Sequence, residues 1–347
     1  MHLFSRLTLI LACLCVLALP AGANAGIKSI WGPATLPDGS SAFPLYKKLG
    51  VEDVQWVVPW TSVAPTKPAN PRDPADPAYS WGPDLDFVMA EAARHRIQVT
   101  LILNTAPGWA NGGRGSNFGP LNAADFGDFA FAASKKYPSV RRFSVWSEAG
   151  RPSNFAPMPE GKRSGPRAFA KVVDAGYVGL MQANRRNVVI AGASDTAGDV
   201  RPAQFVKWMK LPNGKSPRFH WWSHNAFSAR FPEIKDKPFK SAPFARDLND
   251  IDTFIKEVRR HHGKKKKLWI SEYGIQTDQP SSVFNFFVSR RVQARWLSAT
   301  YRLVRRAPYV AGLGWYRLLD DGDQRWGLYT GSMQAKPAAT AFKRIKY

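Results

Sequence analysis

Cysteine is nearly absent from this chain of 347 residues, which contains only Cys13 and Cys15. Both lie within residues 1–25, which have the features of a secretory signal peptide. If that segment is removed, the chain that begins at Gly26 has no cysteine and can form no disulfide bond. This composition is compatible with export from a bacterium but does not require it.

The expected signal has three parts in the usual order. Arg6 supplies a positive charge, Leu7 to Leu19 form an apolar stretch, and residues 23–25 read Ala-Asn-Ala, which is a cleavage pattern. A lipoprotein anchor at Cys13 is the alternative. We therefore predict a signal peptide over 1–25 and a secreted protein, either extracellular or associated with the cell wall.

Acidic residues are also scarce: 26 Asp and Glu stand against 49 Lys and Arg, which gives a formal net charge of +23. A charge of this size promotes binding to polyanions. Outside the cell these are wall polymers, anionic lipid surfaces or acidic polysaccharides. The sequence has no pattern of a helix-turn-helix or an aromatic-basic RNA-binding strand, so we expect no specific nucleic-acid partner.

Metal ligands are few as well. The chain has six histidines and no HExxH or similar cluster, which argues against a catalytic metal. Asp320, Asp321 and Asp323 are close together but lack the downstream Glu of a calcium loop, so we interpret them as a solvated loop. We expect no cofactor.

No apolar run after the first 25 residues is long enough to span a membrane. Instead, short apolar runs and helix-like segments alternate eight times, as expected for strands that are buried on both faces. The expected strands are 28–31, 54–58, 98–103, 142–146, 187–191, 219–222, 268–271 and 310–314. The expected helices are 43–49, 83–95, 123–137, 166–184, 203–209, 248–262, 283–305 and 335–345.

This alternation predicts an α/β protein with a single (β/α)8 (TIM) barrel over residues 26–347. Asn122 and Asp247 are expected to cap two of the helices, and Gly263 to end one. The alternative is a doubly wound open sheet. The sequence disfavours it, because no Gly-rich phosphate loop follows the first strand.

Two segments place a glutamate just after a buried strand. They are residues 143–150, which read Phe-Ser-Val-Trp-Ser-Glu-Ala-Gly, and residues 268–274, which read Leu-Trp-Ile-Ser-Glu-Tyr-Gly. In a barrel of parallel strands, these ends face the substrate, so Glu148 and Glu272 should share one rim. Two carboxyl groups there can cleave a glycosidic bond, one as acid and the other as nucleophile. The alternative is that each glutamate is an exposed loop residue.

These motifs resemble those of the clan-A retaining glycoside hydrolases, most closely families 39 and 5, over nearly the whole chain after the signal. Residues 146–150 are similar to the Trp-Asn-Glu-Pro motif after strand four, and residues 270–274 to the nucleophile motif of strand seven. Residues 219–227 resemble the strand-six segment, and residues 314–315, Gly-Trp, the end of strand eight. The resemblance implies a (β/α)8 fold and hydrolysis of a glycan.

The resemblance also implies roles for individual residues. Glu148 corresponds to the acid/base and Glu272 to the nucleophile. His224 corresponds to the strand-six histidine that borders the catalytic centre, and Trp315 to the tryptophan that floors the subsite. A structural role is the alternative for His224.

Two positions depart from the family pattern. Ser147 replaces the Asn that contacts the sugar 2-hydroxyl, and Gln55 stands where the family usually has an Arg that holds the nucleophile ionised. An opposite charge lowers a carboxyl pKa by roughly 1–3 units, whereas a neutral amide offers only a hydrogen bond. We therefore expect a less ionised Glu272, or a basic residue from another segment that compensates.

Four further residues are candidates for substrate binding because they fall at strand ends on the expected rim. Asn104 ends the third strand, Tyr273 follows Glu272, and Trp60 and Trp109 could stack on sugar rings. For Trp109, a place over the core of the barrel is an equally valid interpretation.

The two rims of the expected barrel differ in net charge. The loops after the strands hold fifteen basic and fifteen acidic residues, so the catalytic rim is balanced. The helix-to-strand turns are strongly basic, partly because helix C-termini favour cations. Sixteen cations lie there: Arg94, Arg96, Lys135, Lys136, Arg141, Arg142, Arg185, Arg186, Arg259, Arg260, Lys264, Lys265, Lys266, Lys267, Arg305 and Arg306. We expect this rear face to bind an anionic cell-wall or surface polymer.

Together these features predict a secreted, monomeric, retaining glycosidase that degrades a neutral, β-linked polysaccharide or glycan. A barrel that binds glycans without cleaving them, or one held at the wall by its basic face, remains the alternative.

Overall fold

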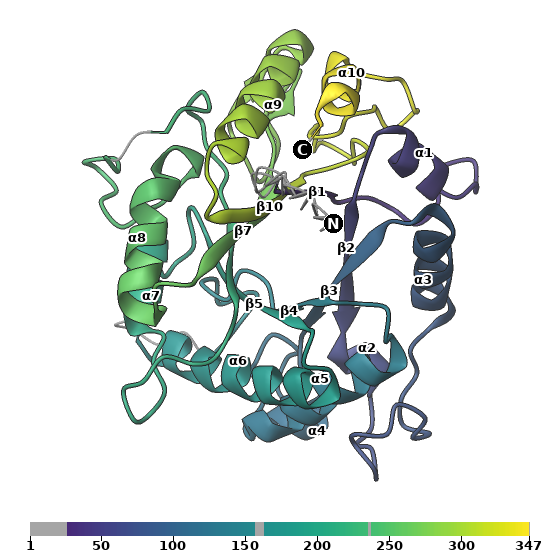
Figure 1. Cartoon of the computed structure of the whole chain (residues 1–347), viewed down its shortest axis with the longest axis vertical. Coiled ribbons are helices and arrows are strands. Elements are labelled where there is room, and N and C mark those ends of the chain that lie inside the picture. Colours follow the sequence, from purple (N-terminus) through teal and green to yellow (C-terminus); the bar gives the residue numbers. More distant parts are fainter. Residues whose placement is uncertain (1–25, 157–162, 235–236, 347) are drawn as a thin grey trace, which may run out of the picture.

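The computed structural model describes residues 26–156, 163–234 and 237–346 (Figure 1). The expected signal segment therefore lies outside the described residues. Eight parallel strands close into a barrel in the order β1-β10-β7-β6-β5-β4-β3-β2. These strands are β1 (Ile27–Ile30), β2 (Asp53–Pro59), β3 (Gln98–Asn104), β4 (Arg142–Val145), β5 (Val188–Asp195), β6 (Trp221–Asn225), β7 (Lys267–Tyr273) and β10 (Val310–Trp315).

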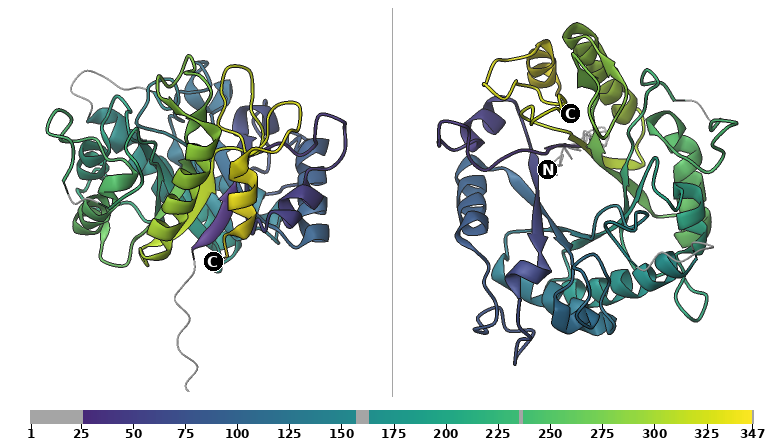
Figure 2. Two further views of the ribbon diagram at one scale, coloured as in Figure 1. Left: turned by 90° about the horizontal axis from the view of Figure 1, so that it is seen from above. Right: turned by 180° about the vertical axis from the view of Figure 1, so that it is seen from behind.

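Helices surround this barrel on all sides (Figures 1 and 2). They are α1 (Phe43–Lys48), α2 (Trp60–Val63), α3 (Pro83–His95), α4 (Gly108–Asn111), α5 (Ala123–Lys136), α6 (Ser164–Ala183), α7 (Pro202–Trp208), η1 (Leu248–Asp250), α8 (Ile251–His262), α9 (Arg290–Arg305) and α10 (Pro337–Arg344). The prediction of a (β/α)8 barrel is confirmed. In the described ranges, no helix has the combination of length and apolar character needed to cross a membrane.

Helix ends follow the local chemistry of the sequence. The Asn122 side chain accepts a hydrogen bond from the Ala124 amide at 3.1 Å, and that of Asp247 accepts one from Asn249 at 2.9 Å, so both predicted caps are confirmed. The helix predicted over 283–305 begins later, at Arg290, because the Ser289 hydroxyl caps it by accepting from the Val292 amide. Residues before Ser289 include β9 (Phe287–Val288), which pairs with β8 (Gln276–Thr277).

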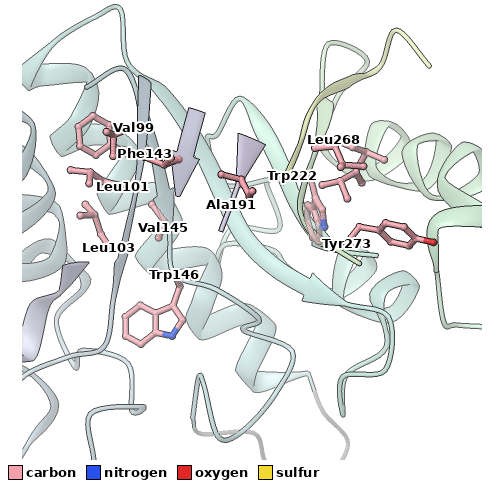
Figure 3. Close-up of a cluster of buried hydrophobic side chains, with 14 of the residues drawn as sticks. Val99, Leu101, Leu103, Phe143, Val145, Trp146, Ala191, Trp222, Leu268 and Tyr273 are labelled. Atoms are coloured by element: carbon pink, nitrogen blue, oxygen red, sulfur yellow. The ribbon is translucent and has the colours of Figure 1, made fainter. Parts of the chain in front are cut away.

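Side chains on successive strand residues point alternately outward and inward. Outward residues of β3 and β4, such as Leu101 and Val145, belong to the buried apolar cluster between strands and helices (Figure 3). Inside the barrel, Trp221 stacks on Trp269 with ring centroids 5.9 Å apart. This alternation decides which side chains near the strand ends can reach a ligand.

Not every predicted rear-face cation is on the surface. Arg142 turns into the barrel, where its guanidinium lies 2.5 Å from the buried Asp53 carboxylate. The Lys266 ammonium donates to the Phe219 carbonyl, and burial lowers the pKa of Lys266 to about 8. The prediction that all sixteen cations form one surface is therefore too broad, because Arg142 and Lys266 already bind groups of the protein.

Candidate active site

The structure brings Glu148 and Glu272 together at the carboxyl end of the barrel. Glu148 follows β4, and Glu272 lies near the end of β7, in register with Asn225 of β6. The Asn225 amide donates to Glu148 Oε1 at 2.8 Å and also contacts the Glu272 carboxyl group. Since a hydrogen bond spans about 3 Å, a shared amide places the nearest oxygens of the two carboxyl groups within about 6 Å of each other.

An irregularity in β7 turns Glu272 towards this site. The pairing of β7 with β6 skips Ser271, and the pairing with β10 shifts in the same region. A bulge of this kind lets two successive side chains point to the same side of a strand. The Ser271 hydroxyl therefore donates to Asn225 Oδ1 inside the barrel while Glu272 still reaches the same asparagine.

The loop that carries Glu148 has an unusual backbone. Trp146 and Glu148 have positive φ angles of 66° and 46°, values that non-glycine residues seldom adopt and that cluster at functional sites. The loop also packs closely on β5. A Cβ atom at Gly192 would meet the Trp146 carbonyl oxygen at 1.8 Å, so only glycine fits there. Packing thus fixes the direction in which Glu148 points.

Charged neighbours surround Glu148. Arg151 Nε lies 3.4 Å from Glu148 Oε2, and its Nη2 donates to the buried carboxylate of Asp195. Burial and the nearby Asp195 charge raise the pKa of Glu148, while Asn225, Arg151 and Asn154 oppose that rise. Asp195 also pairs with Arg151, so the guanidinium does not act on Glu148 alone.

Burial and the nearby Glu148 carboxyl raise the pKa of Glu272, whereas Asn225 and Arg317 lower it. Two carboxyl groups this close favour a state in which one is protonated and the other ionised. Arg317 follows β10 and supplies a positive charge near Glu272. The raised pKa agrees with the expectation of a less ionised Glu272, and Arg317 compensates for it only in part.

Three aromatic rings lie beside Glu272, and all are partly exposed. The Trp31 indole donates to the Ser271 carbonyl at 2.8 Å, and its ring lies edge-on to Tyr316. Phe227 packs against Tyr316 with centroids 5.9 Å apart. Burial and the Glu272 charge raise the pKa of Tyr316, which places the phenol close to the carboxyl pair.

Five of the predicted binding residues are buried away from this site. Trp315 and Tyr273 are 0% exposed and face the helices beside each other, with centroids 6.2 Å apart. Trp60 is also 0% exposed and stacks on Phe129 of α5. The prediction that these three side chains bind sugar is therefore wrong. The physical reason is strand alternation: Tyr316, one residue beyond Trp315, is the one that turns inward.

Gln55 and His224 are the other two. Gln55 lies inside the barrel, where it donates to the Ser271 carbonyl at 2.7 Å and accepts from the Trp269 indole at 3.1 Å. His224 points outward from β6 and packs on Phe254 of α8. Neither side chain can contact a sugar from these positions.

Ser147, Asn104 and Trp109 lie at the rim and are partly exposed. The Trp109 indole donates to the Ala64 carbonyl at 2.9 Å, and its ring packs edge-on to Trp60. Contact of these three residues with a sugar stays a prediction.

His224 gives a prediction about stability. Its Nε2 lies 3.0 Å from the Arg246 carbonyl oxygen, and burial lowers the pKa of His224 to about 4. The unfolded chain binds a proton near pH 6.5 and the folded chain does not, so stability should fall as pH drops from about 6.5 to about 4. The loss attributable to His224 is on the order of 3 kcal/mol.

We expect His224→Gln to lose less unfolding free energy than the native protein between about pH 7.5 and pH 4.5, by about 2–3 kcal/mol. Urea titrations at the two pH values measure this difference. His95→Gln, at a partly exposed histidine of α3, is the control. Equal pH dependence in His224→Gln and the native protein would contradict the assignment.

Sequence reasoning missed Asn225, Asp195, Arg151, Tyr316 and Trp31. Asn225 and Asp195 end strands, as Glu272 nearly does, so their position was a usable signal. The strand-six motif favours His224, whereas strand alternation turns Asn225 to the interior and His224 to the helices. Arg151 and Asp195 are 44 residues apart, and only the folded chain joins them.

The described residues contain no group of three or more His, Cys, Asp or Glu side chains suited to a metal ion. Each of the three aspartates considered above has a protein partner. Asp320 accepts from Lys336, Asp321 pairs with Arg317, and Asp323 accepts from the Ser282 amide.

No family model and no curated protein matches this sequence. Solved structures do match. A family 39 glycoside hydrolase from Bacteroides cellulosilyticus WH2 has 18% identity and a TM-score of 0.67 over 92% of this chain and 63% of its own. A monomeric β-xylosidase from Caulobacter crescentus CB15 has 14% identity and a TM-score of 0.65, over 93% and 69%.

A glucosidase from Croceicoccus marinus has 13% identity and a TM-score of 0.67, over 91% of this chain and 66% of its own. The chain thus spans roughly two thirds of the length of these neighbours. At such low identity the likeness concerns the fold. The protein has the eight-stranded parallel barrel of family 39 glycoside hydrolases, which belong to clan A.

Proposed function

We propose that this protein is a glycosidase that hydrolyses O-glycosidic bonds of a neutral, β-linked glycan with retention of anomeric configuration. The observation that carries the proposal is the contact of one amide, that of Asn225, with both Glu148 and Glu272. Retaining enzymes need carboxyl groups about 5–5.5 Å apart, and inverting enzymes need roughly 6.5–9.5 Å. A shared amide makes the two carboxyl groups close neighbours, and the retaining mechanism is the one that needs the closer pair.

The reaction has two steps. In the first, protonated Glu148 donates its proton to the glycosidic oxygen while the Glu272 carboxylate attacks the anomeric carbon and the bond to the leaving group breaks. In the second, Glu148 removes a proton from water, which displaces Glu272 from the anomeric carbon. The partly exposed rings of Trp31 and Tyr316 offer apolar surfaces for the sugar.

Glu148 has to be protonated at the start, and its neighbours favour that state. Asp195 raises the pKa of Glu148 directly and neutralises Arg151, which would otherwise hold Glu148 ionised. On the other side, burial and Glu148 raise the pKa of Glu272 well above its ordinary value, and Arg317 opposes only part of that rise. The acid role of Glu148 and the nucleophile role of Glu272 rest on their positions, after β4 and near the end of β7, which are those of the family motifs.

A screen of aryl glycosides that differ in sugar and anomeric configuration tests the activity. We expect a burst of aryl alcohol with at least one β-glycoside. A barrel that only binds glycans is the second candidate, because Ser147 offers a shorter side chain than the family's Asn. Binding of a glycan without any turnover across the panel would favour that second candidate. Export of the protein is part of the same proposal and can be checked by locating it in cell fractions.

Asp195→Asn should move the alkaline limb of the pH profile of kcat/KM to lower pH. The substitution removes a negative charge that raises the pKa of Glu148 and leaves Arg151 uncompensated, so Glu148 loses its proton earlier. Above that limb, activity should fall about tenfold for each pH unit by which it moves. Arg151→Gln should move the same limb to higher pH, because the cation lowers the pKa of Glu148.

Asp174→Asn is a matched control, since Asp174 pairs with Arg218 outside the site. An unchanged limb in Asp195→Asn, or movement in the same direction in both Asp195→Asn and Arg151→Gln, would show that this ion pair does not set the protonation of Glu148.

A further inference from the structure

The C-terminal part of the chain has an extreme charge imbalance. Residues 279–347 contain twelve basic residues and three acidic ones, and no acidic residue lies between Asp278 and Asp320. Helix α9 carries five arginines, no lysine and no acidic residue. The exposed face of a helix normally carries both positive and negative residues. A face with arginines and no acidic residue therefore indicates a negatively charged partner.

Helix α10 packs alongside α9 on the outside of the barrel (Figures 1 and 2). Two adjoining cavities lie between these helices, with volumes of about 460 Å³ and about 270 Å³. Arg302, Arg344 and Ser298 line both cavities, so the two form one groove. We call it the α9–α10 groove.

The groove runs between the two rims of the barrel. Its larger cavity includes Arg295, near the start of α9 on the side of the strands' carboxyl ends, and the smaller one includes Arg305 at the opposite end of the helix. The α9 residues that line the groove run from Ala294 to Arg305, and at 1.5 Å per residue the groove is about 15–17 Å long. That length suits a chain better than a single small anion.

The arginines of the groove point to solvent. Arg295, Arg302, Arg305 and Arg344 are exposed, and within the described residues no carboxylate lines either cavity. The helix dipole favours cations in the last turn of α9, which accounts for Arg302 and Arg305. It does not account for Arg295 or for Arg291, which lies in the first turn, where a cation is unfavourable. Helix α9 therefore carries more arginines than the stability of the helix explains.

The residue types of the groove indicate the chemistry of the ligand. Arginine binds carboxylate and similar oxyanions through two parallel hydrogen bonds, whereas lysine acts as a point charge. The larger cavity also presents apolar surface from Phe231, Pro337 and Ala341. Oxyanions spaced along a chain of rings with apolar faces are the features of an acidic polysaccharide.

We propose that the α9–α10 groove binds a carboxylated polysaccharide chain, with Arg295, Arg302 and Arg344 holding its carboxylate groups. This site is separate from the glutamate pair, and the proposal does not depend on catalysis there. It shares Arg305 with the predicted rear-face site but not the lysines of that site, which include the exposed Lys264 and Lys265 and the partly exposed Lys267.

Affinity for polygalacturonate, measured by titration calorimetry at fixed ionic strength, tests the proposal. We expect the triple variant Arg295→Gln, Arg302→Gln, Arg344→Gln to bind about tenfold or more weakly than the native protein. The matched control replaces Lys264, Lys265 and Lys267 with Gln. This control removes the same net charge and should change the affinity by no more than about twofold. All six side chains are surface residues or partly exposed, and thermal unfolding of each variant checks that it is folded.

A second variant replaces the same three arginines with lysine. It keeps the charge and removes the paired hydrogen bonds, so we expect intermediate affinity. Equal losses in the groove variant and the lysine control would overturn the proposal in favour of non-specific charge. A larger loss in the lysine control would overturn it in favour of the rear face. Tighter binding of polyphosphate or of anionic lipid vesicles than of polygalacturonate would also overturn it, because the groove would then not be selective for a glycan.

Discussion

Replacement of Glu272 by Gln is expected to abolish turnover of every glycoside that the native protein hydrolyses. The amide is nearly the same size as the carboxylate but cannot attack the anomeric carbon, so the first step stops whatever the leaving group. The expected loss in kcat is on the order of 10⁴-fold or more. Steady-state assays with aryl glycosides measure this loss.

Azide gives a stricter test of the Glu272 role. In a variant with a small side chain, such as Glu272→Ala, a bound azide anion can attack the anomeric carbon in place of the carboxylate. We expect the product to be a glycosyl azide of inverted configuration. Asp38→Asn, at an exposed carboxylate in a loop at the same end of the barrel, is the control and should retain activity. Substantial turnover by Glu272→Gln would exclude Glu272 as the nucleophile.

Replacement of Glu148 by Gln should have an effect that depends on the leaving group. A poor leaving group needs a proton to depart, so kcat/KM for such a substrate should fall about 10²–10⁴-fold. An activated aryl group departs without that help, so its kcat/KM should fall by less than about tenfold. The comparison needs only two substrates of the same sugar.

In the same variant, the second step should become slow for both substrates, because no base remains to activate water. The glycosyl-enzyme should then accumulate with the activated substrate, and a burst of aryl alcohol should precede slow turnover. Equal loss of kcat/KM for the two substrates would show that Glu148 does not protonate the leaving group.

The barrel was predictable because its strands are short apolar runs separated by helices with readable ends. Runs such as 54–58 and 99–103 are buried or partly buried on both faces, and their apolar composition is typical of central strands. Boundaries were less predictable. The strand expected over 219–222 is β6 (Trp221–Asn225), because the residues that end it are polar, and two of them, Ser223 and Asn225, face the barrel interior.

The direction of side chains at the strand ends was the main obstacle in predicting the site. Trp315 and Tyr273 carry the aromatic character expected of a sugar platform, yet they face the helices, and Tyr316 faces the carboxyl pair. The residue types alone do not show which of these side chains faces the barrel interior. Their direction depends on the register of each strand and on the bulge at Ser271, where the pairing of β7 with both of its neighbours shifts.

Ion pairs between loops were out of reach for a similar reason. Arg151 lies in the loop after β4 and Asp195 at the end of β5, and neither segment shows from its sequence that it contacts the other. Gln55, by contrast, is a position that the sequence alone identifies as unusual. It departs from the family pattern, and its amide binds the Ser271 carbonyl and the Trp269 indole inside the barrel, so it supplies no positive charge to Glu272.

The configuration of the first-formed sugar tests the central claim most directly. Proton NMR during hydrolysis of the preferred aryl glycoside distinguishes the two anomers before they equilibrate. Double displacement through Glu272, with Glu148 as acid and then base, predicts that the first product has the same anomeric configuration as the substrate. A first product of the opposite configuration would contradict the claim, since it requires a single displacement by water.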